Sequence, residues 1–263
     1  MTRILSALVL LPIVVGTVWF LPPVATLILA LVAAMLAFVE YASIAEALDT
    51  HVPRTVCTAA VLTACASVGG GYFSVDLVLM TAVIAIGALA VASGQPGPAI
   101  LRDTAAALLP VLYIGLPLGA LAAVRALGGR EALLLLMATI VVSDSAQYYC
   151  GRAFGRAPLA PSISPKKTVE GAIGGMVFGT LAMTAGGHYV FPAAAWTLLV
   201  LVSASISALG IVGDLFESLL KRSAGVKDSS ALIPGHGGVL DRIDSWLFAA
   251  PVYYVFIRYL QFP

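Results

Sequence analysis

Residues 24–48 read VATLILALVAAMLAFVEYASIAEAL, a stretch long and apolar enough to cross a lipid bilayer as one helix. The rest of the chain has the same character, because 60% of its 263 residues are hydrophobic and only 10% are charged. A typical soluble domain carries roughly 25% charged residues. We therefore predict an all-α polytopic membrane protein and exclude a disordered chain, a secreted disulfide scaffold and an ordinary cytosolic enzyme.

The net charge and the cysteine spacing argue against a nucleic-acid partner, a disulfide framework and a thiolate metal site. The net charge of +1 gives no field that would attract nucleic acid, so no nucleic-acid partner is expected. Cys57, Cys65 and Cys150 are scattered and lack C-x-x-C spacing. Neither a disulfide framework nor a thiolate metal site follows from that spacing.

Nine segments are predicted to span the membrane, with Pro and Gly residues marking the breaks between them. They cover residues 4–21, 24–48, 55–73, 75–92, 104–126, 132–149, 171–190, 194–220 and 243–260. The first segment resembles a signal peptide but lacks an A-x-A cleavage site, so we interpret it as retained. We divide the chain into residues 1–130, which hold about five scaffold helices, and residues 131–263, which hold the remaining helices and two polar loops.

The distribution of Lys and Arg predicts the orientation. With nine spans, eleven of the 14 basic residues fall on the side of the N-terminus and only Arg125, Arg130 and Arg258 fall on the other. Basic residues favour the cytoplasmic side. The N-terminus and the long polar loops are therefore predicted to face the cytoplasm. The Ala- and Gly-rich chain also suggests a bacterial plasma (inner) membrane.

Charged residues gather in the C-terminal half. Residues 144–244 hold 15 of the 27 charged side chains, and charge at membrane depth is usually placed for function. The first charged segment, 144–170, reads DSAQYYCGRAFGRAPLAPSISPKKTVE. Thr168 is a candidate helix N-cap, and Lys166 and Lys167 near that helix end suit a phosphate. The same basic residues could instead act only as topology signals that meet lipid headgroups.

The second charged segment, 213–245, reads GDLFESLLKRSAGVKDSSALIPGHGGVLDRIDS. Asp214, Glu217 and Lys221 share one face of a helix, and Asp241 and Asp244 are one turn apart at the start of the next. Hard oxygen ligands beside lysines suit Mg²⁺ that holds a polyphosphate. The alternative is a set of structural ion pairs, such as Asp214 with Lys221 or Arg222.

The stretch SLLKRSAGVKDSSALIPGHGGVLDRID, residues 218–244, closely resembles the signature of phosphatidate cytidylyltransferases, also called CDP-diacylglycerol synthases. The upstream ISPKKTVEG also looks like this family. The resemblance implies a nucleotidyltransferase of phospholipid biosynthesis that converts CTP and phosphatidate, a membrane lipid, to CDP-diacylglycerol and pyrophosphate. It also implies a Mg²⁺ cofactor, with K⁺ as a candidate second metal. It further implies a homodimer, with residues 1–130 as the candidate for its contacts and residues 131–263 as the catalytic region.

The resemblance also implies roles for individual residues. The residues expected to carry the chemistry are Asp214, Lys221, Asp241 and Asp244. Asp214 and Asp241 are the first metal ligands, and Asp144 and Asp244 follow as ligands or as residues that hold the ligands. Substrate and phosphate binding is expected of Ser164, Lys166, Lys167, Thr168, Arg222, Lys227, His236, Gly237, Gly238 and Arg242.

Two other hypotheses about the function remain open at this point. Related membrane enzymes that act on isoprenoids, such as a CTP-dependent polyprenol or phytol kinase or an isoprenoid-phosphate cytidylyltransferase, share features of the second segment. A cation-coupled transporter would also carry intramembrane carboxylates, but it predicts them near the midplane and in two symmetric halves. Here the charges crowd into one half of the chain.

Overall fold

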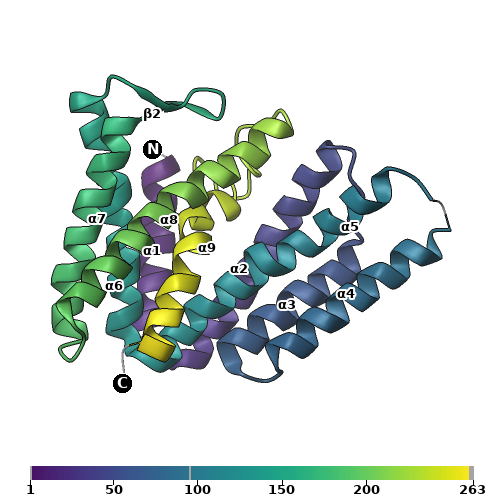
Figure 1. The fold of residues 1–263 in the computed structure, drawn as a ribbon, viewed down its shortest axis with the longest axis horizontal. Helices are drawn as coiled ribbons and strands as arrows, with labels where there is room; N and C mark the ends of the chain where they lie inside the picture. The colour runs from purple at the N-terminus through teal and green to yellow at the C-terminus, as the bar shows by residue number, and fades with distance from the viewer. Residues whose placement is uncertain (1, 95, 261–263) are drawn as a thin grey trace. The chain divides into compact units, whose positions relative to one another are not determined.

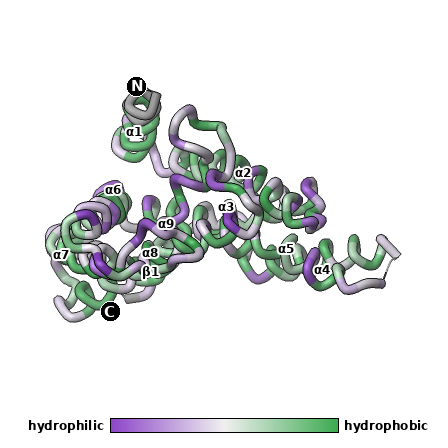
Figure 2. The backbone as a smooth tube through the Cα atoms, turned by 90° about the horizontal axis from the view of Figure 1, so that it is seen from above, coloured by the Kyte–Doolittle hydropathy of each residue, from purple (hydrophilic) through white to green (hydrophobic). Residues whose placement is uncertain are grey.

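The computed structural model of the chain describes residues 2–94 and 96–260, and the side chains of residues 8–94 and 96–259. Helices account for most of the chain (Figure 1). The residues fall into two compact units, Met1–Ala123 with Ser223–Arg242 and Val124–Arg222 with Ile243–Pro263. We call these the first and the second unit. In both, hydrophobic residues run along the helices (Figure 2), as expected for an all-α membrane protein.

The first unit contains most of the N-terminal helices. They are α1 (Thr2–Phe20), α2 (Pro23–Ala47), α3 (Arg54–Gly70), α4 (Val75–Ala92), α5 (Ala99–Pro110) and the π-helical segment η1 (Val111–Gly115). Helix α3 is central, because it packs against α2, α4 and η1. Pro23 opens α2, where the absent amide N–H costs nothing. Gly71 ends α3 in the left-handed conformation, with φ of 65°.

Two glycines one helical turn apart allow the helices of the first unit to approach closely. A Cβ atom at Gly115 would lie 2.8 Å from the carbonyl oxygen of Val61, and one at Gly119 would lie 2.6 Å from that of Cys65. Both contacted carbonyls belong to α3. Small residues spaced by four are a common means of packing helices in membranes, where lipid supplies no hydrophobic drive for helix association.

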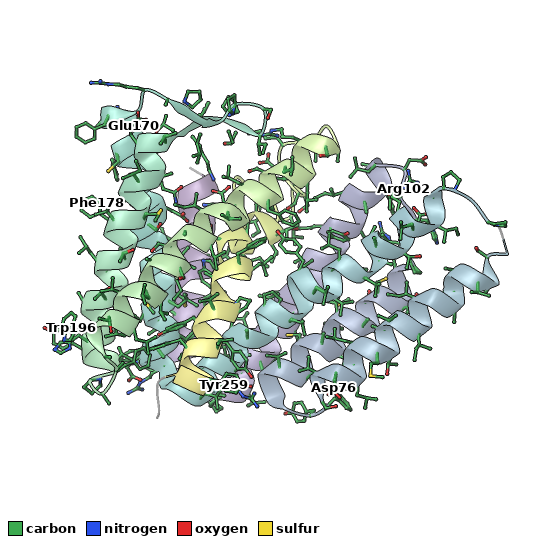
Figure 3. All side chains as sticks on the ribbon, in the orientation of Figure 1. Asp76, Arg102, Glu170, Phe178, Trp196 and Tyr259 are labelled. Atoms are coloured by element: carbon green, nitrogen blue, oxygen red, sulfur yellow. The ribbon has the colours of Figure 1, made fainter. Side chains whose placement is uncertain are left out.

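The second unit is built from the remaining elements. They are most of α6 (Leu116–Phe154), β1 (Pro158–Ala160), β2 (Ser164–Thr168), α7 (Val169–Val190), α8 (Trp196–Ser223), α9 (Leu240–Val255) and η2 (Phe256–Leu260). Helix α6 bends at Gly129, whose φ of 83° and ψ of 178° are not helical. Phe191, Tyr253 and Phe256 pack together as an aromatic cluster. The labelled Glu170 and Trp196 mark opposite ends of this unit (Figure 3).

The segment between α6 and α7 differs from its prediction. We expected an irregular loop after Cys150, but α6 continues to Phe154 and a two-stranded antiparallel hairpin follows. The hairpin is too short to show the alternating pattern by which strands are found in a sequence. The predicted N-cap at Thr168 is confirmed, because its hydroxyl accepts a hydrogen bond of 3.1 Å from the Gly171 amide.

The helices lie close to the predicted spans, but the number of membrane crossings stays a prediction. Among the described residues, five helical runs are long and apolar enough to cross a membrane. One of them, Ala99–Phe154, has 56 residues, well beyond the roughly 20 that a single crossing needs. Two shorter apolar helices, Leu8–Phe20 and Arg54–Gly70, accompany them. Arg3, which we used in the charge count, lies outside the residues with described side chains.

The close approach at Gly119 can be tested by adding a side chain. We expect Gly119→Val to destabilise the protein by about 1–3 kcal/mol, because the new methyl groups would collide with backbone atoms of α3. Thermal unfolding in detergent micelles measures the change. Gly87→Val on α4 is the matched control, since a Cβ there meets nothing within 4 Å. Equal midpoints for the two variants would contradict the packing argument.

Candidate active site

The second unit brings together charged residues from four elements, which we call the carboxylate–lysine cluster. Its members are Asp144 on α6, Lys167 on β2, Asp214 and Lys221 on α8, and Asp244 on α9. Lys167 Nζ forms an ion pair with Asp214 Oδ2. Asp244 interacts electrostatically with Asp214, Asp144 and Lys221. Charged residues up to 100 positions apart in the sequence are therefore close enough to interact electrostatically.

A close contact between two helices places Asp214 beside Asp244. Gly213 precedes Asp214 on α8, and a Cβ at Gly213 would lie 2.5 Å from the Asp244 carbonyl oxygen and 3.2 Å from Phe248 Cβ. Only a glycine allows α8 and α9 to meet at this point. The Ser218 hydroxyl donates to Asp214 Oδ1 at 3.4 Å, and the Ser245 amide donates to Asp244 Oδ1 at 2.7 Å. Both carboxylates are thereby held in place.

Asp144 is held by its own helix. Gln147 Nε2 donates a hydrogen bond of 3.0 Å to Asp144 Oδ1, three residues earlier on α6. Residues three apart share one face of a helix, which allows this contact. The side chain of Asp144 is exposed, so it can reach a ligand at little desolvation cost.

Lys221 has an ion-pair partner that the sequence analysis did not predict. It forms an ion pair with Glu217, one turn earlier on α8, and Glu217 is completely buried. Asp214, which we had considered as a partner for Lys221 or Arg222, pairs with Lys167 instead. Two adjacent acid–base pairs therefore occupy one side of α8. A buried carboxylate needs such a partner, because an isolated charge in an apolar interior is very costly.

The hairpin positions Lys167. Strand β2 pairs antiparallel with β1, with Pro158 opposite Thr168 and Ala160 opposite Ser164. Glu170, at the start of α7, accepts hydrogen bonds from the backbone amides of Arg156, at 2.9 Å, and Ala157. The base of the hairpin is thus tied to α7 (Figure 3). Neighbouring strand residues point to opposite faces, so Lys166 is exposed while Lys167 reaches Asp214.

The remaining predicted residues are divided between the units, with Ser164, Lys166, Thr168 and Arg222 in the second unit. The first unit contains residues 223–240, which we call the signature loop and which include Lys227, His236, Gly237 and Gly238, followed by Asp241 and Arg242. Asp241 directly follows this loop. Its Oδ2 accepts hydrogen bonds from the Ser229 amide at 2.9 Å and from the Gly238 amide at 2.7 Å, and it lies 2.9 Å from the Ser229 hydroxyl oxygen. The Asp241 carboxylate therefore closes the loop onto α9. Lys227 and Arg242 are exposed there, as is Arg222 at the end of α8 in the second unit.

The His-Gly-Gly part of the loop forms a tight turn. The Ile233 amide donates to the Gly237 carbonyl at 2.8 Å, and the His236 amide donates to the Ile233 carbonyl at 2.9 Å. Gly237 has a φ of 83°, which L side chains rarely adopt. The glycine pattern is thus required by the backbone of the turn, whatever it binds.

Sequence reasoning missed Glu40, on α2. Its side chain is only 4% exposed. It accepts hydrogen bonds from the hydroxyls of Ser229 and Ser230 and from the amides of Val239 and Leu240. The available signal was an acidic residue inside an otherwise apolar span, which is usually functional.

The oxygen donors of the cluster suit Mg²⁺, a hard cation. Among the described residues, however, no three acidic, His or Cys side chains stand in an arrangement ready to hold a metal ion. The charge of Asp214 is balanced by Lys167. The chemistry of the donors therefore fits the predicted metal, but the ligand set is not preassembled.

Two hollows of the first unit are lined by other residues. An apolar groove of about 410 Å³ runs between α3 and α4, lined by residues such as Ala59, Phe73 and Val78. A polar hollow of about 370 Å³ lies beside Glu46 and Arg102. Neither is lined by a predicted site residue.

Comparison with known proteins agrees with the family resemblance of the signature. Residues 1–260 match the model of the cytidylyltransferase family. The phosphatidate cytidylyltransferase of Helicobacter pylori is 39% identical over 155 residues, which cover 59% of this chain and 58% of that protein. The corresponding protein of Haemophilus influenzae is 42% identical over 132 residues, 49% of this chain and 46% of that protein.

A third relative, the phosphatidate cytidylyltransferase of Bacillus subtilis, is 38% identical over 148 residues, 56% of this chain and 55% of that protein. The chain thus spans about half the length of the curated relatives it matches. The family match covers nearly the whole chain. The chain belongs to the cytidylyltransferase family, as its signature predicts.

Proposed function

We propose that this protein is an integral-membrane phosphatidate cytidylyltransferase, which makes CDP-diacylglycerol and pyrophosphate from CTP and phosphatidate. The observation that carries the proposal is the carboxylate–lysine cluster, assembled from four elements in a chain of the cytidylyltransferase family. The names of the relatives from Helicobacter pylori and Bacillus subtilis support the choice of lipid substrate.

The reaction joins two anions, so charge repulsion is its main obstacle. An oxygen of the phosphatidate phosphate attacks the α-phosphorus of CTP, and the bond from that phosphorus to the oxygen bridging to the β-phosphate breaks. Pyrophosphate leaves with the bond electrons. Because the attacking oxygen is already anionic, no general base is needed. Positive groups that neutralise and align the phosphates supply the catalysis.

Lys167 and Lys221 are suited to that task. Each is paired with a carboxylate, so each is held in position before substrate arrives. A substrate phosphate competes with Asp214 for Lys167 and thereby frees the Asp214 carboxylate. Lys166, Arg222, Lys227 and Arg242 add exposed positive charge for the remaining phosphate groups.

Asp214, supported by Asp144 and Asp244, is the proposed holder of Mg²⁺, and Asp241 is a further proposed ligand. Bound Mg²⁺ would neutralise phosphate charge and polarise the α-phosphoryl group. K⁺ remains the candidate second metal. The ion pairs with Lys167 and Lys221 hold the carboxylates of Asp214 and Glu217 in position on α8.

The proposed location is a bacterial inner membrane, with the N-terminus and the site facing the cytoplasm. The unequal distribution of Lys and Arg along the sequence supports this orientation. CTP is then available from the cytosol, while phosphatidate keeps its acyl chains in the bilayer. A homodimer remains the proposed assembly.

Replacing the central carboxylate tests the reaction and the site together. We expect Asp214→Asn to lower pyrophosphate release from CTP, Mg²⁺ and phosphatidate by on the order of 100-fold or more, because it removes charge that faces the phosphates. Release is measured with purified protein in detergent. Asp76→Asn, on the exposed start of α4, is the matched control and should keep the parent activity.

The other outcomes of this assay separate the alternatives. Equal release by Asp214→Asn and the parent would keep the enzyme but remove Asp214 from its site. Formation of CDP with a polyprenol, and no reaction with phosphatidate, would replace the proposal with a lipid kinase. Folded protein that is inactive with every lipid acceptor would favour a transporter.

The buried pair on α8 allows stability to be separated from catalysis. Lys221→Met should destabilise the protein by about 3–5 kcal/mol, because it leaves Glu217 buried without its ion-pair partner. The double variant Glu217→Leu/Lys221→Met should regain most of that stability, yet remain inactive if Lys221 binds a phosphate. Thermal unfolding and pyrophosphate release measure the two effects. An active double variant would show that Lys221 serves only packing.

A further inference from the structure

The carboxylate of Glu40 accepts four hydrogen bonds, two on each oxygen. Oε1 accepts from the Ser230 hydroxyl at 2.7 Å and the Val239 amide at 2.9 Å. Oε2 accepts from the Ser229 hydroxyl and the Leu240 amide, both at 2.8 Å. All four donors are neutral and all come from the signature loop. Burying a carboxylate costs much free energy unless such hydrogen bonds compensate it. Through these bonds one side chain of α2 holds a segment that lies about 190–200 positions later in the sequence.

Two of these bonds cap helix α9. The first amides of a helix have no partner within it, and Val239 and Leu240 lie at the start of α9. A residue next to the helix usually supplies the cap. Here the distant Glu40 supplies it, and a carboxylate is favoured at this end because the helix dipole is positive there. Glu40 of α2 therefore satisfies the amides at the start of the first turn of α9.

Ser229 connects Glu40 to Asp241. Its hydroxyl oxygen lies 2.8 Å from Glu40 Oε2 and 2.9 Å from Asp241 Oδ2. Gly238, whose amide donates to Asp241, lies against the same group. A Cβ at Gly238 would collide with both the Ser229 hydroxyl and the Glu40 carboxylate. The second glycine of the His-Gly-Gly turn therefore makes room for this contact.

We propose that Glu40 is a positioning residue for the cytidylyl transfer, which fixes the carboxylate of Asp241 by holding the signature loop and the first turn of α9. The inference rests on the proposed function. Glu40 acts through Ser229, Ser230 and the backbone of the loop, and its own bonding capacity is taken up by them. Its role is to select one arrangement of a glycine-rich loop that would otherwise sample many.

The test replaces Glu40 by its neutral isostere and measures kinetics. Glu40→Gln keeps the shape, but its amide nitrogen cannot accept the two bonds that one oxygen accepts now. We expect kcat to fall by on the order of tenfold or more, while KM for CTP changes by less than about threefold. Glu46→Gln is the matched control, because Glu46 lies on the same helix but is exposed and pairs with Arg54. Its kcat should equal that of the parent.

A second measurement reports how readily the signature loop opens, independently of enzyme activity. Hydrogen exchange of residues 229–240 and tryptic cleavage after the exposed Lys227 should both speed up in Glu40→Gln and stay unchanged in Glu46→Gln. Ser230→Ala is a milder variant that removes one of the four donors, so it should give a smaller change in the same direction. Ser230→Thr, which keeps the hydroxyl, should restore the parent behaviour. This series decides the question even if Glu40→Gln fails to fold.

The outcomes separate this inference from the proposed function. A faster-exchanging loop with an unchanged kcat would make Glu40 a structural anchor only and overturn the positioning role. An unchanged loop and an unchanged kcat would overturn both the contact and the role. A parent protein that is inactive with CTP and phosphatidate, but whose loop responds to Glu40→Gln, would overturn the proposed function and leave Glu40 as the organiser of the loop.

Discussion

An ionised group inside an apolar chain must have a partner, and the arrangement of the charged elements follows from that constraint. In the second unit, Glu217 pairs with Lys221 and Asp214 pairs with Lys167. In the first unit, Glu40 relies on four neutral donors instead. Each solution requires a particular backbone: a helix with the right spacing, a hairpin that delivers a lysine, or a loop that turns its amides inward.

Small residues allow the close backbone contacts on which these ion pairs and hydrogen bonds depend. Gly213 lets α8 and α9 meet beside the two aspartates, and Gly119 allows close packing on α3. In lipid, helices gain little from burying apolar surface, so contact at atomic range must supply the cohesion. The abundance of glycine in this chain, 25 residues, is consistent with a protein that places polar groups through close backbone approach.

Much of the fold could be predicted from the sequence, because long apolar segments separated by Pro and Gly have few alternatives to transmembrane helices. The cap at Thr168 and the pairing of Asp144 with Gln147 were also predictable, since both depend on neighbours within one or two turns. The hairpin at 158–168 was not, because its strands are short and lack alternation. The partners of Asp214 and Lys221 were misjudged, and Glu40 was missed. Local spacing cannot reveal that Lys167 arrives from a hairpin, or that a residue of α2 binds a loop near residue 235.

The discontinuity of the first unit has a consequence for how the protein is made. Its residues 223–242 are separated from the rest of that unit by residues 124–222. A ribosome delivers α2 to the membrane long before the loop that binds Glu40 exists. During that interval the acidic side chain has no native donors, and the early helices cannot reach their final state. The contacts of Glu40 therefore form only after residue 240 has been translated, and a chain terminated before the signature loop would lack both these donors and the signature residues.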